Sequence, residues 1–278
     1  MCLINKNLFL GLSFLLYFFS ITYNLKVFAQ NITFKIQNNI VKEISIADLK
    51  KNLKISSMEV IEPHENKKIV YSGFKIKEVL NYIYGKNWKK NELVLFICAD
   101  GYKDPISAEK IFIENPLLAI EKKGSSDFSV NNQLQNQKNI PLAPMYLVWN
   151  NINNSQLLAE GSNGWPYQVV SLELTNFAEK FPHMIPLNNS NDKISRGFKG
   201  FQSYCMTCHK INGDGGDKGP ELTSFPIKYE QLDKWIDNPT SLKANTTMPP
   251  LNLKVKNRKQ LITDIIEYLK FMNSKNIK

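Results

Sequence analysis

Hydrophobic and polar positions follow two different periods in the part of the chain after residue 30. Residues 32–36 alternate apolar and polar side chains, which is typical of a strand with one buried face. Residues 46–53 and 76–83 repeat apolar side chains at helical spacing. Residues 93–99 form a continuous apolar run, and 168–174 is another apolar alternation, so both favour strands. The mixture predicts an α+β domain.

Domain boundaries follow from the places where this periodicity stops. We assign the α+β domain to 30–180, including a polar, Asn- and Gln-rich segment at 125–139 that we expect to be a surface loop. Residues 181–192 contain two prolines and a polar cluster, which indicates a linker. The remainder, 193–278, has helical periodicity at 194–205, 229–237 and 259–272. It is therefore predicted to be an all-α second domain.

The N-terminal segment has the pattern of an export signal. Lys6 precedes an apolar run from Leu8 to Ile21, and the segment ends in Val27, Phe28 and Ala29. We expect a signal peptide over 1–29, cut before Gln30. The alternative is an uncleaved membrane anchor, for which the apolar run is short. In both cases the rest of the chain is exported, to the periplasm or an equivalent compartment, and only the anchor would bring it to a membrane.

Charge and cysteine content narrow the chemistry. The chain has 35 Lys and Arg against 25 Asp and Glu, a formal net charge of +10, but only two arginines, Arg196 and Arg258. Nucleic-acid recognition relies on arginine forks and stacking aromatics, so we expect no nucleic-acid partner. Beyond the signal the cysteines are Cys98, Cys205 and Cys208. A close pair with one odd thiol argues against a disulfide framework.

Cys205, Met206, Thr207, Cys208 and His209 form the c-type haem attachment signature. Two thiols three residues apart on a helical turn can each bond one porphyrin, and the next residue then directs its imidazole to the iron. A zinc site would need further ligands, and a redox dithiol would follow a strand rather than a helical run. We therefore predict one covalent haem c, bound through Cys205 and Cys208, with His209 as an axial iron ligand.

Met248 is the candidate for the second axial ligand. It lies in Asn245, Thr246, Thr247, Met248, Pro249 and Pro250, where the prolines stiffen an extended loop that could hold a thioether against iron. The alternative for a methionine is a core position, which we assign to Met184 and Met272.

The C-terminal third, about 193–275, resembles class I cytochrome c domains. Gly197 and Phe201 stand eight and four residues before Cys205, where that family packs its first helix on its last, and Tyr268 is the expected counterpart. The resemblance implies that the carbonyl of Pro220 accepts a hydrogen bond from His209. It also implies one-electron transfer with both axial positions filled. Apolar packing against the haem is expected from Phe201, Phe225, Trp235 and Leu253.

The N-terminal domain resembles the molybdopterin-binding fold of the sulfite oxidase family. The resemblance rests on short segments: Tyr71 with Gly73, Val79 with Leu80, Asp100 with Gly101 and Tyr102, Pro144 with Tyr146, and the stretch from Trp165 to Leu174, which ends in a strand with Glu173. The family's molybdenum ligand is a cysteine upstream of the Asp-Gly-Tyr segment, whereas Cys98 lies two residues before Asp100. Residues 30–189 also contain no arginine for an anion pocket. We therefore expect a cofactor-free relative that serves as a docking module.

Three functions remain open at this point. The first is an exported mono-haem electron carrier with an accessory α+β domain, which is not an enzyme. The second is a molybdenum-dependent oxidoreductase similar to a sulfite dehydrogenase, with the haem as its electron exit. The third is a haem-based redox sensor.

Smaller assignments complete these expectations. Cys98 is predicted to be a buried apolar residue, and Asp100 and Tyr102 to be turn residues. We place His64 at the surface and His183 in the linker. Lysines near the haem motif suggest a redox partner with an acidic surface; they are Lys193, Lys199, Lys210, Lys218 and Lys243.

Overall fold

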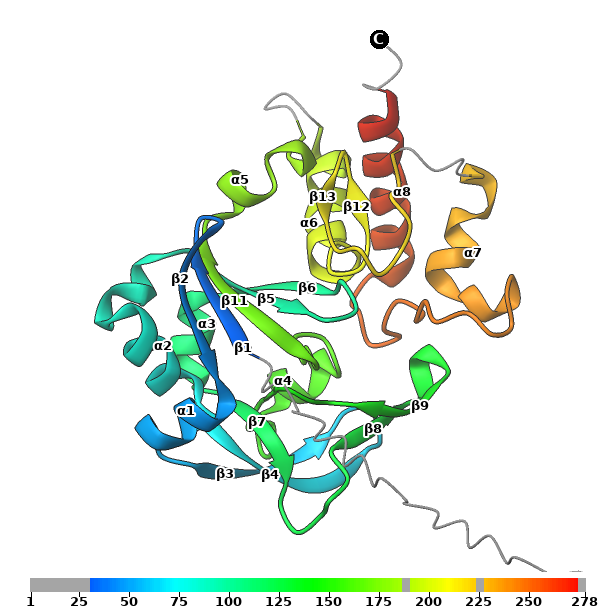
Figure 1. Cartoon of the computed structure of the whole chain (residues 1–278). Coiled ribbons are helices and arrows are strands. Elements are labelled where there is room, and N and C mark those ends of the chain that lie inside the picture. Colours follow the sequence, from blue (N-terminus) through cyan, green and yellow to red (C-terminus); the bar gives the residue numbers. More distant parts are fainter. Residues whose placement is uncertain (1–30, 187–190, 224–227, 275–278) are drawn as a thin grey trace, which may run out of the picture.

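The structure is a computed structural model that describes residues 31–186, 191–223 and 228–274. Several β-sheets form over the first part of the chain, and the C-terminal region is richer in helices (Figure 1). The mixed α+β character predicted from the periodicity is therefore confirmed. The expected signal peptide and Phe225 lie outside the described residues. Among the described helices, none combines the length and the apolar character that crossing a bilayer requires.

The larger sheet has five strands in the order β2-β1-β11-β5-β6. β1 pairs in parallel with β11, and the other neighbours are antiparallel. The first and last strands of the N-terminal region therefore lie side by side, so this sheet needs both ends of the region to form. Its strands are β1 (Asn31–Ile36), β2 (Asn39–Ser45), β5 (Leu93–Cys98), β6 (Lys103–Ser107) and β11 (Val169–Thr175).

A second sheet has four antiparallel strands in the order β10-β7-β4-β3. They are β3 (Ser56–Glu62), β4 (Lys67–Lys75), β7 (Leu117–Lys122) and β10 (Tyr146–Val148). At Gly73 in β4, a Cβ atom would stand 2.0 Å from the carbonyl oxygen of Leu118 in β7. Only glycine allows this close approach of the two backbones.

A hairpin occupies the segment that the sequence predicted as a surface loop. It consists of β8 (Ser129–Asn132), a 3-10 turn η2 (Gln133–Gln135) and β9 (Gln137–Pro141). The loop prediction for 125–139 was therefore wrong over these strands. Val130 and Ile140 are cross-strand partners and are both buried in the N-terminal core, which anchors an otherwise polar hairpin.

The helices of the N-terminal region are short. Ser45 caps α1 by accepting a hydrogen bond from the backbone of Asp48 at 3.0 Å, and Ser107 caps α3 in the same way. The elements are α1 (Ile46–Asn52), α2 (Ile76–Tyr84), α3 (Ala108–Glu114), α4 (Ser155–Glu160), α5 (Phe177–Lys180), and the 3-10 turns η1 (Lys86–Lys90) and η3 (Pro182–Met184). The helices expected at 46–53 and 76–83 are confirmed.

The C-terminal region is built on two helices that pack against each other, α6 (Asp192–Tyr204) and α8 (Arg258–Ser274). At Gly197 a Cβ atom would lie 2.0 Å from the carbonyl oxygen of Asp264, so the helices touch through backbone there. The rings of Phe201 and Tyr268 lie 5.6 Å apart between centroids. The expected contact between the first and last helices is thus confirmed. The remaining elements are β12 (Lys210–Ile211), β13 (Asp214–Gly215), η4 (Tyr229–Gln231), α7 (Leu232–Asp237) and η5 (Pro239–Ser241). Because β12 and β13 pair as antiparallel strands, the region is rich in helices but not all-α as predicted.

Strand β5 contributes to two hydrophobic cores. Val94 and Phe96 point into the N-terminal core, whereas Leu95 and Ile97 belong to the C-terminal core. Burial on both faces explains why this strand is continuously apolar. Phe181 and Met184, from the segment expected to be a linker, are also buried in the C-terminal core. The helical region therefore packs directly on the larger sheet.

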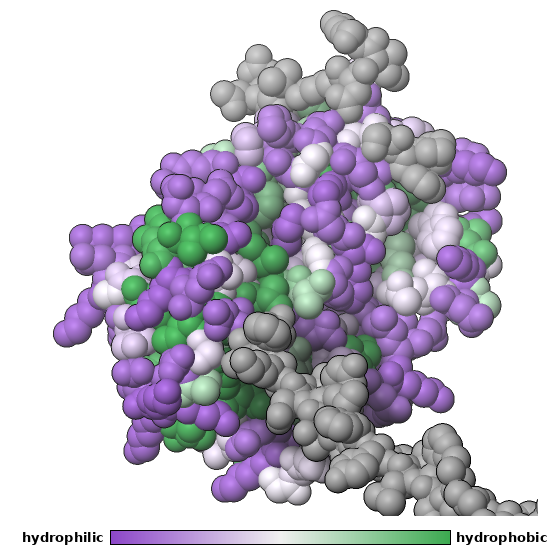
Figure 2. Space-filling model, in the orientation of Figure 1, coloured by the Kyte–Doolittle hydropathy of each residue, from purple (hydrophilic) through white to green (hydrophobic). Residues whose placement is uncertain are grey.

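The surface is largely hydrophilic, with apolar areas on the side of the molecule that carries β2 (Figure 2). Exposed apolar residues of β1 and β2 are Ile36, Ile40 and Val41. β2 is the outer strand of its sheet, so this apolar area lies along a sheet edge.

Candidate haem site

The two cysteines of the attachment signature lie on a helical turn directly after α6. The backbone N–H of Cys205 donates to the carbonyl of Phe201 at 2.9 Å, and that of Cys208 donates to the carbonyl of Cys205 at 3.1 Å. Both side chains are free thiols and partly buried. Burial raises the pKa of Cys205 to about 12, so this sulfur is a neutral thiol at physiological pH.

His209 is held in one orientation by the segment that follows it. Its Nδ1 lies 2.9 Å from the carbonyl oxygen of Pro220 and donates to it, which leaves Nε2 with its lone pair for a metal. Burial lowers the pKa of His209, although the Pro220 carbonyl acts in the opposite direction. The ring is therefore neutral, as a metal-binding imidazole must be.

Gly219 makes room for this ring. A Cβ atom at Gly219 would stand 2.6 Å from Cε1 of His209. Any side chain would have to displace the imidazole or the backbone beside it. Glycine at this position thus lets the chain cross one face of the imidazole and place the next carbonyl against Nδ1.

Met248 lies on an extended segment that both regions of the molecule hold. Its backbone N–H donates to the hydroxyl of Thr246 at 3.1 Å, and Thr246 is buried. The amide of Asn136, from the β8–β9 hairpin, donates to the carbonyl of Thr246 at 2.8 Å. After the prolines, the backbone N–H of Leu251 donates to the carbonyl of Ile236 in α7. Met248 is half-buried, and its role as an axial ligand stays a prediction.

The residues present fit a covalently bound haem c. Two thiols, an imidazole with a fixed tautomer and a backbone cradle at Gly219 lie within one stretch of chain. Among the expected apolar contacts, Phe201 is buried and Trp235 is partly buried, whereas Leu253 is 81% exposed. The contact of these side chains with a haem stays a prediction.

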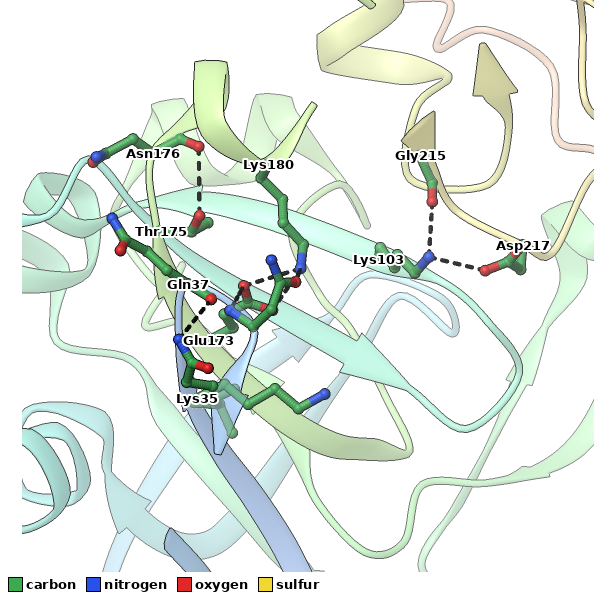
Figure 3. Close-up of polar contacts among 12 residues, drawn as sticks. Lys35, Gln37, Lys103, Glu173, Thr175, Asn176, Lys180, Gly215 and Asp217 are labelled. Carbon is green, nitrogen blue, oxygen red and sulfur yellow. Dashed lines mark hydrogen bonds and ion pairs between the residues drawn. The ribbon is translucent and has the colours of Figure 1, made fainter. Parts of the chain in front are cut away.

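The attachment turn is also a contact surface for the N-terminal region. The backbone N–H of Lys103 donates to the carbonyl of Thr207 at 3.0 Å, and that of Asp217 donates to the carbonyl of Gly101 at 2.8 Å. The Lys103 ammonium reaches the Gly215 carbonyl and the Asp217 carboxylate, at 3.0 and 2.9 Å (Figure 3). The segment Asp100-Gly101-Tyr102 and the start of β6 are thus docked on the turn that carries Cys208.

An ion pair closes the same interface. The Lys218 ammonium lies 2.7 Å from a carboxylate oxygen of Asp100, with only 16% of the lysine side chain exposed. Lys210 pairs with Asp217. Two of the five lysines expected to face a partner are therefore engaged within the chain, while Lys193, Lys199 and Lys243 are exposed.

Cys98 is a buried residue of the N-terminal core. Its exposed fraction is 4%. Burial raises its pKa well above the ordinary value, and the charges of Asp100 and Asp104 act in the same direction. A neutral, buried thiol is the state of a core residue, as the sequence predicted. Asp100 and Tyr102 form the turn after β5, also as predicted.

A buried polar cluster was missed at the sequence level. His64, expected at the surface, is 9% exposed, and its Nδ1 lies 2.7 Å from the Glu62 carboxylate. The same carboxylate accepts from the hydroxyls of Tyr71 at 2.7 Å and Tyr146 at 3.1 Å. The surface assignment of His64 was therefore wrong, because the side chain forms a hydrogen bond with the buried Glu62 carboxylate.

One signal could have located this cluster. Met58, Val60 and Glu62 alternate along β3 and all face inward, so the carboxylate continues a buried apolar face. A buried carboxylate must find hydrogen-bond donors, and the polar residues nearest in sequence include His64. The tyrosines come from other strands and could not have been assigned locally.

Comparison with known proteins adds no assignment. No protein-family model matches the chain, and no curated protein sequence matches it either. The resemblances of the two regions therefore rest on the residues and geometry described above.

Proposed function

We propose that this protein is an exported mono-haem c-type cytochrome that carries single electrons between redox partners. The observation that carries the proposal is the His209 imidazole, fixed by Pro220 and Gly219 one residue after a pair of free thiols. Haem c supplies reversible one-electron chemistry at its iron when bound. The chain's own residues would tether it through Cys205 and Cys208 and hold His209 in a single tautomer.

The N-terminal region would serve as an accessory docking module in this proposal. Its segment from Asp100 to Lys103 contacts the C-terminal region through two backbone hydrogen bonds, from Lys103 to Thr207 and from Asp217 to Gly101, and through the Lys218–Asp100 ion pair. Leu95 and Ile97 add apolar contact from β5. This arrangement supports a fixed cover over one side of the attachment turn, so that an acidic redox partner would approach through the exposed lysines Lys193, Lys199 and Lys243.

The decisive experiment tests for covalent haem. The full chain would be exported in a host that matures c-type cytochromes, and the denatured protein examined for haem that stays attached. We expect one haem per chain by pyridine haemochrome assay, and none after Cys205→Ala with Cys208→Ala. The matched control is Cys98→Ala, which removes a thiol outside the signature. Loss of haem in the control alone, or no haem in the natural chain, would refute the proposal.

Two further measurements on the same sample separate the alternative functions. Metal analysis should find iron without molybdenum; equal amounts of both would instead support a molybdenum-dependent oxidoreductase. The ferrous protein should not bind carbon monoxide, because Met248 is proposed to fill the sixth position. Met248→Ala should bind it, with Met184→Ala as the methionine control. Ready binding by the natural chain would favour a haem-based sensor.

A further inference from the structure

Asp104 is a buried carboxylic acid with an unsatisfied oxygen. It lies on β6 opposite Phe96 of β5, and the residue is 5% exposed. Its Oδ2 atom makes no hydrogen bond to any of the described residues. A buried carboxylate without donors is costly, whereas the protonated acid is tolerated much better. This position therefore favours a carboxyl group that holds its proton.

Four titratable groups interact electrostatically with Asp104. Lys110 belongs to α3, Cys98 to β5, Tyr102 to the turn between β5 and β6, and Cys208 to the candidate attachment turn. Burial raises the pKa of Asp104 to about 7, and the positive charge of Lys110 opposes this. Cys98 and Tyr102 are neutral because their pKa values are raised well above the ordinary range by burial.

Lys110 does not neutralise this carboxyl directly. Its ammonium is 2.6 Å from a carboxylate oxygen of Glu160 in α4 and stands over the ring of Trp149. Lys218, the other cation close to Cys208, is paired with Asp100. Both neighbouring lysines therefore have carboxylate partners other than Asp104, which leaves this group free to gain or lose a proton near neutral pH.

The side chain of Asp104 shares the N-terminal face of the larger sheet with Phe96, but its backbone is next to a contact with the candidate attachment turn. The residue before Asp104, Lys103, donates its N–H to the carbonyl of Thr207, the residue before Cys208, at 3.0 Å. Burial is the main cause that raises the pKa of the Cys208 thiol, and the charge of Asp104 acts in the same direction. A charge on the carboxyl therefore acts on the sulfur that would carry the porphyrin, and the low dielectric around the buried Asp104 strengthens the effect.

We propose that Asp104 takes up a proton when the haem tethered at Cys205 and Cys208 is reduced, and releases it when the haem is oxidised. The inference rests on the proposed function. With haem bound, the chain would take up one electron from a redox partner and one proton from solvent together, and the proton would convert the Asp104 carboxylate into the neutral acid. Charge is conserved because the added electron and proton cancel. By linkage, the electron and the proton favour each other's binding to the same extent.

The experiment measures the midpoint potential of the purified holoprotein against pH, from about two units below to about two units above pH 7. The equilibrium constant for reduction should fall about tenfold as pH rises, a usual size for such coupling. For a one-electron couple this fall is ~59 mV. Asp104→Asn should abolish most of it, because the amide keeps the shape but does not titrate.

Asp100→Asn is the matched control. It also removes a carboxylate near Cys208, but Asp100 is ion-paired with Lys218 and lies on a partly exposed turn. We expect this variant to shift the potential by a similar amount at every pH and to keep the slope. If Asp104→Asn keeps the slope of the natural chain, or if the natural chain shows no slope, the inference is wrong.

A second measurement covers the case in which Asp104→Asn does not fold. Infrared difference spectra of the natural holoprotein near pH 7, with ¹³C-labelled aspartate, should show a protonated carboxyl band that appears on reduction. Absence of this band would overturn the inference. A chain without covalent haem would refute the proposed function and the inference together, whereas a haem whose potential ignores pH would refute the inference alone.

Discussion

Leu95 and Phe96 are neighbours on β5, yet their side chains are buried in two different hydrophobic cores. Phe96 is in the core between the N-terminal sheets, and Leu95 is in the core built by α6 and α8. Both side chains have no exposed surface. The strand therefore links the stability of the helical region to the larger sheet. Substitutions on one face of β5 should affect one core and leave the other intact.

Leu95→Ala should weaken the C-terminal region selectively. The substitution leaves a cavity in the second core and should lower the free energy of unfolding by about 2–5 kcal/mol. Because the helical region loses part of its support on β5, haem absorbance should change before far-ultraviolet circular dichroism in a denaturant titration. Val94→Ala, which opens a cavity in the first core, is the control. If haem absorbance and circular dichroism change in the same order in both variants, the two cores do not unfold separately.

Gly219→Ala tests the cradle around His209. The added Cβ would meet Cε1 of the imidazole at 2.6 Å, so the ring must move and its bond to Pro220 must lengthen. We expect less haem incorporated per chain and an altered axial-ligand spectrum in the haem that is bound. Gly124→Ala is a suitable control, since nothing lies within 4 Å of its added Cβ, and its φ of 78° would strain the alanine and so include the general cost of replacing a glycine. Equal haem loading and spectra in both variants would show that the crowding at His209 has no consequence.

The elements that could be predicted are those whose signal is local. The alternation at 32–36, the helical spacing at 76–83 and the Gly197–Phe201 spacing before Cys205 all identify structure that the chain adopts. The Cys-x-x-Cys-His signature is also local, because all five of its positions are consecutive in the sequence. In each case the physical cause acts within a few residues or along one face of one helix.

The rest could not be predicted because it depends on contacts between distant segments. The apolar run of β5 indicates burial on both faces, but nothing in it says that α6 and α8 supply the second cover. From the sequence, Lys218 is expected to be an exposed lysine near the haem motif, because its ion pair with the distant Asp100 forms only in the folded chain. Asp104 is likewise an ordinary strand carboxylate in the sequence, and only the fold buries it.

Glu62→Gln should destabilise the N-terminal region at neutral pH. Glu62 is fully buried and holds His64, Tyr71 and Tyr146 together, so removing its charge breaks a buried network and should cost about 3–5 kcal/mol. The control is Glu59→Gln, an exposed carboxylate on the same strand. Urea unfolding followed by circular dichroism gives both values. A loss no larger than that of Glu59→Gln would contradict the role assigned to the cluster.

The pH dependence of this loss has a defined sign. Burial acts to raise the pKa of Glu62, but the bonds and charge of His64, with the Tyr71 hydroxyl, outweigh it and leave the pKa below its ordinary 4.5. A carboxyl with a depressed folded pKa contributes stability above its unfolded pKa and loses it as pH falls through the folded value. The difference between the natural chain and Glu62→Gln should therefore be largest above pH 4.5 and shrink in acid.

Lys218→Met tests how firmly the N-terminal region is docked on the attachment turn. The Lys218–Asp100 pair is mostly shielded from water, with 16% and 28% of the two side chains exposed, and the lysine also approaches the hydroxyl of Tyr167 at 3.4 Å. Losing a charged hydrogen bond at such a site costs about 1.5–3 kcal/mol. Limited proteolysis of the segment joining the two regions should become faster in proportion, because the interface opens more often.

Lys270→Met is the matched control for this variant. Lys270 also forms an ion pair, with Glu267 on α8, but 49% and 43% of the two side chains are exposed and the pair lies within a single helix. Solvent screens such a pair, so its loss should change stability by no more than about 0.5 kcal/mol and leave the cleavage rate as it was. If Lys218→Met is cleaved no faster than Lys270→Met, the ion pair does not hold the interface, and Leu95, Ile97 and the backbone bonds at Thr207 and Gly101 must be sufficient to hold it.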